Sequence, residues 1–325
     1  MAAAAAIIGS KNFIFLNNPI PKLSNRSRSR PLKRQLPVSR KRVLATNMAA
    51  DSGRSKFMEF PYASPPVRNL MVELVSMVED RLGSQQLQPC HLPEDVQFYQ
   101  NESGTSQASL HIRSGSHSSQ VDFMLGSWLH FGLPAGGEVN ITSLSAYLNS
   151  STDAPNFLIE LIQRSPASMV LILDLPPRKD LVLHPEYLQT FYEDTKLDAH
   201  RQLLSELPEV TPYVSSSLYI RSVVSPTAIL VNIQAGEGGQ ERLEGIVSDH
   251  IHPVAIQVLE TWLGRCALIG REVGENERLV LDMRDGLVKN KTIEIDLGSS
   301  LPRLFGQQTA DRVLAAIRDV FSAKA

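Results

Sequence analysis

The sequence predicts an α/β fold in which a single antiparallel β-sheet is sandwiched between α-helical layers. Five segments with strand character follow one another between residues 107 and 175, joined by short links rich in Gly, Ser and Asn. Such links leave no room for crossover helices, so neighbouring strands are expected to pair antiparallel. Amphipathic segments on either side of the strands can cover both faces of one sheet. Because composition does not change after residue 60, we expect one domain over residues 49–325.

Each element is predicted from the spacing of its apolar residues. A first helix is expected to begin at Pro65, with Ser64 as its N-cap, because apolar residues then recur at helical spacing. The period changes to two at residue 107. Strands are predicted at 107–113, 121–131, 138–148, 156–163 and 168–175, with a later extended pair at 217–223 and 227–234. Helices are predicted at 185–195, 197–207, 241–269 and 308–325, the third one broken or kinked near Pro253.

The first 50 residues differ from the rest in charge. They hold ten basic residues and no acidic one, so residues 51–325 carry 22 bases against 34 acids. A leader that is rich in Arg and Ser and free of acids is typical of an organelle transit peptide. We therefore expect residues 1–48 to be a disordered plastid transit peptide that is removed. The alternative is a retained basic arm for RNA or anionic lipid, which the acidic body and the lack of aromatic residues among the bases disfavour.

Several kinds of site find no support in the sequence. No GxGxxG turn, Walker loop or GxSxG elbow is present, and no cluster of His and Cys has metal-ligand spacing. Cys90 and Cys266 are far apart and suggest neither a disulfide framework nor a zinc site. No apolar run approaches the roughly 18 to 20 residues of a membrane span.

The carboxyl group of Glu160 is unusual because it lies within the apolar segment FLIELI. Alternation along a strand puts Glu160 on one face with Leu158 and Ile162, and neither face of the segment is polar. Burial disfavours the charged form of a carboxyl group, so Glu160 is expected to stay protonated near neutral pH and to be able to deliver a proton. The alternative is a structural Glu that binds a backbone amide or a buried Arg.

Several long segments together carry a resemblance to a known family. They include KFMEFPY, LNSSTDAPNFLIELIQ, VLILDLPPRKDLVLHPEYL and LPEVTPYVSSSLYIRSVVSPTA. From about residue 56 to the C-terminus, the chain resembles red chlorophyll catabolite reductase of higher plants, a family related to the ferredoxin-dependent bilin reductases. This resemblance implies the same sheet between helical layers.

The resemblance also implies a chloroplast stromal enzyme of chlorophyll breakdown. It would convert red chlorophyll catabolite, the open-chain tetrapyrrole made by pheophorbide a oxygenase, into primary fluorescent chlorophyll catabolite. Reduced ferredoxin would supply the electrons, with no bound cofactor and no metal, and the protein would be a homodimer, for which the C-terminal helix is a candidate. The rival hypothesis is a non-catalytic protein that binds or detoxifies the pigment.

The site residues that the resemblance implies are Glu160 and Asp296 as proton donors and Val224 as the residue that decides which C1 epimer forms. All three are expected to bind the substrate. Ferredoxin is acidic, so it is expected to dock on a local basic patch. The candidate bases are Arg178, Lys179, Arg284, Lys289 and Lys291.

Overall fold

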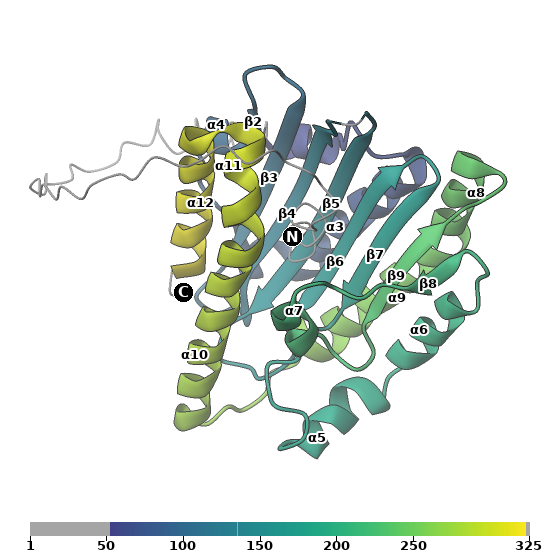
Figure 1. The fold of residues 1–325 in the computed structure, drawn as a ribbon. Coiled ribbons are helices and arrows are strands. Elements are labelled where there is room, and N and C mark those ends of the chain that lie inside the picture. Colours follow the sequence, from purple (N-terminus) through teal and green to yellow (C-terminus); the bar gives the residue numbers. More distant parts are fainter. Residues whose placement is uncertain (1–52, 135, 323–325) are drawn as a thin grey trace, which may run out of the picture.

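The computed structural model describes residues 53–134 and 136–322. Within these ranges the chain forms one antiparallel sheet whose strand order is β1-β3-β4-β5-β6-β7-β9-β8, with β2 paired to β3. Helices cover parts of both faces (Figure 1). The predicted single antiparallel sheet between helical layers is therefore confirmed.

Consecutive strands β3 to β7 form the predicted meander. The strands are β1 (Leu87–Pro89), β2 (Phe98–Gln100), β3 (Ser106–Gly115), β4 (Val121–Gly132), β5 (Glu138–Leu148), β6 (Phe157–Ser165), β7 (Ser168–Asp174), β8 (Val210–Pro212) and β9 (Ile229–Gln234). Their register places Glu160 of β6 opposite Ser143 of β5 and Ile172 of β7. Because paired residues point to the same face, these three side chains lie together.

The back face of the sheet is covered by the first helix and by the long helical segment in the second half of the chain. These elements are α3 (Pro65–Gln86), α8 (Gly239–Ile246), η2 (Val247–Ile251), α9 (His252–Trp262) and η3 (Leu263–Ala267), joined by α5 (Pro185–Leu188), η1 (Gln189–Glu193) and α6 (Leu197–Ser205). Their apolar side chains form the largest core cluster, which includes Leu74, Leu171 and Trp262. As expected, the long helix is divided near Pro253: α9 begins at His252, directly after the wider turns of η2, and Pro253 lies in its first turn.

The front face is the one that carries Glu160. It is covered over β3 and β4 by α11 (Gly298–Phe305) and α12 (Gln307–Ser322), with α10 (Glu275–Thr292) and the wider turns of η4 (Ile293–Leu297) beside them (Figure 1). Short α4 (Glu94–Gln97) joins the same cluster. At the other side of this face lies α7 (Leu218–Val223), close to the ends of β6 and β7 in Figure 1. β6, which carries Glu160, thus lies on the front face between α7 on one side and the helices α10 to α12 on the other. These two groups of helices form the helical borders of the front face.

Two segments differ from the sequence prediction. Residues 217–223 were expected to be extended, but 218–223 form α7, because the Ser217 hydroxyl accepts a hydrogen bond from the Ile220 amide at 3.3 Å and caps the turn. No element was predicted between residues 270 and 307, but α10, η4 and α11 form a helical run over 275–305.

The expected transit peptide, residues 1–48, lies outside the described residues. Among the described helices, none combines the length and the apolar character needed to cross a bilayer. Cys90 and Cys266 are both free thiols, and they lie in or against different core clusters. Cys90 and Cys266 therefore do not form a disulfide with each other.

Candidate active site on the front face of the sheet

Glu160 has no solvent-exposed surface. Its neighbours on the front face belong to an apolar cluster made by β4, β5, β6 and β7 (Phe131, Val139, Ile141, Ile162, Val170 and Ile172). The structure thus places the carboxyl group where the alternation of β6 predicts it, within an apolar layer and in the middle of the sheet.

Two further polar side chains, Tyr213 and Arg164, are not among the site residues expected from the sequence. Tyr213 follows β8, and burial, followed by the charge that Glu160 carries when ionised, raises the pKa of its hydroxyl group. Arg164 lies four residues after Glu160 on β6, and its Nη2 donates to Asn232 Oδ1 at 3.1 Å. Alternation along β6 could have identified Arg164, whereas Tyr213 is brought here only by the pairing of β8 with β9.

A second buried acid lies on the same face at the end of β7. Asp174 is 3% exposed and pairs with Leu158, which places it diagonally from Glu160. Such diagonal neighbours are roughly 7 to 8 Å apart. Burial raises the pKa of Asp174 to about 6, although hydrogen bonds from Ser225 lower it in part. The sequence LILD contains the same signal as Glu160, an acid beside an apolar run, and sequence reasoning missed it.

Val224 is half-buried and directly follows α7. The next residue, Ser225, donates its backbone N–H to Asp174 Oδ2 at 3.0 Å and its hydroxyl to Oδ1 at 2.5 Å. These bonds bring the Val224 segment to the end of β7, close to the strand position diagonal to Glu160. The structure therefore brings Glu160 and the Val224 segment to one region.

Asp296 lies in η4, between α10 and α11. Its backbone is helical, and its side chain lies outside what the structure describes. The neighbouring side chains of Ile293 and Leu297 are buried in the cluster between α11, α12 and the sheet. η4 thus belongs to the helical border of the front face.

Three of the five bases expected to attract ferredoxin do not form an exposed patch. Arg178 is buried, with Nη2 at 2.5 Å from Asp285 Oδ2 and further bonds to backbone carbonyls. Lys289 is buried and paired with Asp122. The ammonium group of Lys179 lies 2.6 Å from Glu277 and 3.4 Å from Asp153. These bases compensate internal acids and are unavailable to a partner.

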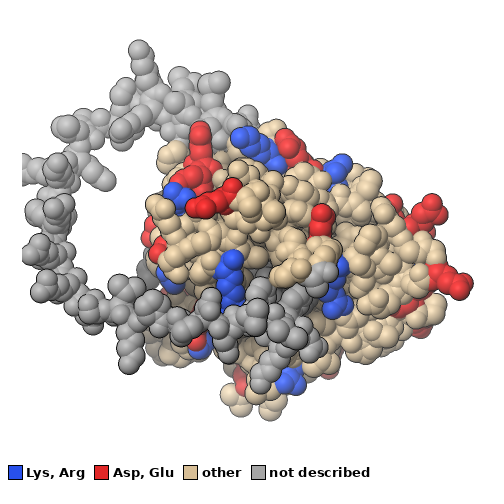
Figure 2. Space-filling model, turned by 45° about the horizontal axis from the view of Figure 1, so that its top comes forward, with Lys and Arg blue, Asp and Glu red and all other residues tan. Residues whose placement is uncertain are grey.

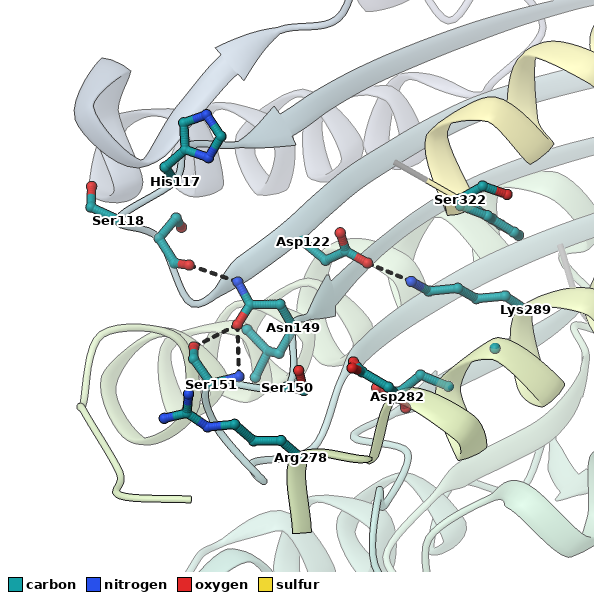
Figure 3. A pocket seen from close by; sticks show the side chains of 15 residues that line it. His117, Ser118, Asp122, Asn149, Ser150, Ser151, Arg278, Asp282, Lys289 and Ser322 are labelled. Atoms are coloured by element: carbon teal, nitrogen blue, oxygen red, sulfur yellow. Dashed lines mark hydrogen bonds and ion pairs between the residues drawn. The ribbon is translucent and has the colours of Figure 1, made fainter. Parts of the chain in front are cut away.

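A cavity of about 490 Å³ lies at the end of β5, between α10 and the end of α12 (Figure 3). Asp122 and Lys289 point toward each other across it, and Asp282 lies nearby on α10. It is lined by Leu148, which is five residues along β5 from the partner of Glu160, or roughly 17 Å at 3.4 Å per residue. The cavity is therefore separate from the Glu160 region.

A second cavity, of about 750 Å³, lies near the β6–β7 turn and has a size suited to a small organic ligand. Arg164 lines it together with Tyr62 and His130, whose rings stack with their centroids 3.8 Å apart. His130 also forms a 2.7 Å hydrogen bond with Asn140. Arg164 thus lines this cavity, roughly 13 Å along β6 from Glu160 at 3.3 Å per residue.

Comparison with known proteins agrees with this architecture. The chain has the fold of phytochromobilin synthase from tomato, solved in complex with biliverdin, with a TM-score of 0.57, 15% sequence identity, and coverage of 79% of this chain and 85% of that one. At that identity the likeness concerns the fold alone.

Sequence comparison is more specific. Red chlorophyll catabolite reductase, chloroplastic, of Arabidopsis thaliana is 55% identical over 274 residues, which cover 83% of this chain and 85% of the relative. Red chlorophyll catabolite reductase 1, chloroplastic, of Oryza sativa is 47% identical over 256 residues, or 78% and 77% of the two chains. The model of the red chlorophyll catabolite reductase family matches residues 66–319. The chain therefore belongs to the red chlorophyll catabolite reductase family.

Proposed function

We propose that this protein is a chloroplast stromal reductase that converts red chlorophyll catabolite to primary fluorescent chlorophyll catabolite, with electrons from reduced ferredoxin. The observation that carries the proposal is a carboxyl group, Glu160, buried in an apolar face of the sheet in a chain of this family. The relatives described above are named for red chlorophyll catabolite, and two of them are named chloroplastic.

The reduction consumes two electrons and two protons. Ferredoxin delivers the electrons one at a time from outside, so the protein itself holds the linear pigment and supplies the protons. We assign Glu160 as the acid that protonates a reduced pigment intermediate, because its carboxyl group lies in the middle of the apolar front face. We assign Asp296 of η4 as the second donor, either directly or through a water molecule. No bound flavin, metal or nicotinamide takes part in this proposal.

We assign Val224 to the stereochemical outcome. Its segment follows α7 and is fastened to the end of β7, diagonal to Glu160. A small side chain at this position leaves room on one side of the pigment, whereas Phe would fill it. The side from which a proton reaches the C1 position would then depend on the size of residue 224.

Ferredoxin is proposed to dock beside α7 and α10. Of the bases expected from the sequence, Arg284 and Lys291 on α10 are partly exposed, and Lys291 forms a solvent-exposed ion pair with Glu294 at 2.7 Å. The charges of both bases act on the hydroxyl of Tyr219 in α7. Arg221, in the last turn of α7, is also exposed. On the face drawn in Figure 2, coloured basic and acidic side chains are scattered rather than gathered. Docking therefore depends on these few bases next to the Val224 segment.

A homodimer remains part of the proposal, but the C-terminal helix is not its interface. The apolar side of α12, which includes Leu314 and Ile317, is buried within the same chain. An exposed apolar stripe instead runs along α10, where Leu279, Met283 and Leu287 are 60 to 65% exposed. Residues four apart lie on one side of a helix, so this stripe is a candidate interface.

The decisive experiment is an anaerobic assay of the purified protein with red chlorophyll catabolite, ferredoxin and a ferredoxin-reducing system. We expect fluorescent product to form without added flavin or metal. Pheophorbide a oxygenase, which makes the substrate, is proposed as a partner that hands it over, so adding it should raise the initial rate. Binding of the pigment without turnover would replace the reductase by a pigment-binding protein.

A further inference from the structure

The segment that follows α7 is held to the sheet by one buried carboxylate. Asp174, the last residue of β7, accepts two hydrogen bonds from Ser225, at 3.0 Å from the backbone amide and 2.5 Å from the hydroxyl. Both residues are almost fully buried, at 3% and 5% exposure. Hydrogen bonds to an ionised acceptor are about twice as strong as bonds between neutral groups, so this is a firm attachment.

Ser225 also organises the turn that leads into β9. Its hydroxyl oxygen accepts a bond from the Thr227 amide at 3.2 Å and lies 3.1 Å from the Thr227 hydroxyl, and its carbonyl accepts from the Ala228 amide at 3.3 Å. Asp174 therefore fixes a turn whose other end enters the sheet at Ile229. Val224 is the residue immediately before this attachment.

Little else holds α7 in place. Only Ile220 is buried among its six residues, while Leu218 is 74% exposed. A short helix with one buried side chain has little apolar contact to oppose local opening. The position of Val224 thus depends on the Asp174–Ser225 contact more than on packing of α7.

We infer that Asp174 is a positioning residue, which fixes the backbone of Val224 through Ser225 and so sets the wall that selects the product epimer. The inference rests on the proposed function for its chemical consequence, but its structural part does not. Asp174 itself neither donates the proton nor contacts the reacting bond in this scheme. Its two oxygens are occupied by Ser225, unlike a group that must face the pigment.

The structural part is tested by hydrogen exchange without any pigment. In Ser225→Ala and Asp174→Asn, amides of residues 218–228 should exchange about ten- to a hundredfold faster, as expected for a lost bond to a charged group. Ser225→Thr keeps the hydroxyl and should restore slow exchange. Ser116→Ala is the matched control, because its buried hydroxyl also donates a short bond, 2.6 Å to Gln85 O, in a loop far from α7.

The chemical part is tested by the ratio of C1 epimers in the fluorescent product. Val224→Phe should reverse the epimer, and Ser225→Ala should give a mixture while kcat stays within about threefold of wild type, since no proton donor is changed. Ser225→Thr and Ser116→Ala should keep the wild-type epimer.

Each failure has a separate meaning. Unchanged exchange over 218–228 in Ser225→Ala would overturn the inference whatever the pigment assay gives. A single epimer from Ser225→Ala, when Val224→Phe reverses it, would overturn it as well. Absence of turnover in the wild type would count against the proposed function, and the exchange comparison would still decide whether Asp174 fixes this segment.

Discussion

Glu160 and Asp174 are two buried acids on one face of the sheet, and their surroundings give them different uses. Both carboxyl oxygens of Asp174 accept hydrogen bonds from Ser225, which gives Asp174 a structural role. Glu160 lies in the apolar middle of β5 to β7, and its charge acts on the hydroxyl group of Tyr213. The proposed function therefore uses Glu160, and not Asp174, as the proton donor.

Glu160→Gln keeps the shape of the side chain and removes the acid. We expect turnover of red chlorophyll catabolite to fall about ten- to a hundredfold, a loss typical of a proton-transfer group, with pigment binding retained. Single-turnover kinetics and pigment titration measure the two effects separately. Wild-type turnover in this variant would make Glu160 a structural residue.

Arg178→Met tests the buried ion pair between Arg178 and Asp285, which replaces the docking role expected of Arg178. It would leave Asp285 buried without its partner, so the free energy of unfolding should fall by about 3 to 5 kcal/mol in urea titrations. Arg201→Met is the matched control, because its pair with Asp198 is exposed and should contribute less than about 1 kcal/mol. Equal losses in the two variants would contradict the assigned role of Arg178.

At the scale of elements, the proposed homodimer is tested at the exposed apolar stripe of α10. Leu287→Asp puts a charge in the exposed stripe and should convert the proposed dimer to a monomer in sedimentation velocity, because burying an unpaired charge in an interface is costly. Leu203→Asp, on α6, changes a residue of similar exposure away from the stripe and should leave the dimer intact. A dimeric Leu287→Asp would exclude the stripe as the interface.

Two bases that border this stripe on α10 test the docking of ferredoxin. Reversing both accessible bases, Arg284→Glu with Lys291→Glu, should raise the KM for ferredoxin about tenfold and flatten its dependence on salt. Arg318→Glu changes an exposed base on α12 and serves as the control. If all variants share the wild-type KM, docking occurs elsewhere.

The sequence predicts elements whose apolar pattern recurs over many residues. It does not predict elements whose conformation depends on a single tertiary or capping contact. The meander from β3 to β7 follows from alternation, and the buried position of Glu160 follows with it. α7 depends on one capping hydroxyl, Ser217, and the approach of Tyr213 to Glu160 depends on β8, a strand of three residues. Likewise, nothing local in PPRKD distinguishes an exposed Arg178 from one paired with Asp285, 107 residues away.

At the scale of the whole molecule, two buried acids give opposite dependences of stability on pH. Burial alone would raise the pKa of Glu79, but hydrogen bonds from His111 and Arg54 outweigh it and lower the pKa to about 2. Its folded pKa is below the unfolded value, so its contribution is present above about pH 4.5 and is lost as pH falls toward 2. Asp174 has a raised pKa, so its protonated form is favoured by folding, and stability falls as pH rises from about 4 to 6.

Urea unfolding at a series of pH values should separate the two groups. Asp174→Asn should remove a decline on the order of 3 kcal/mol between about pH 4 and 6, since each unit of pKa shift corresponds to about 1.4 kcal/mol. Glu79→Gln should instead remove the steep loss below about pH 4 and lower stability at pH 7. Identical pH profiles in wild type and both variants would contradict the assigned shifts.

The inner side of α10 faces the sheet with an acid and, one turn later, a base. Asp285 meets Arg178 from the loop after β7, and Lys289 meets Asp122 from β4. A slide of the helix by one turn, about 5.4 Å, would bring Lys289 opposite Arg178 and set two positive charges against each other. The order of charges therefore favours a single register of α10 against the front face of the sheet.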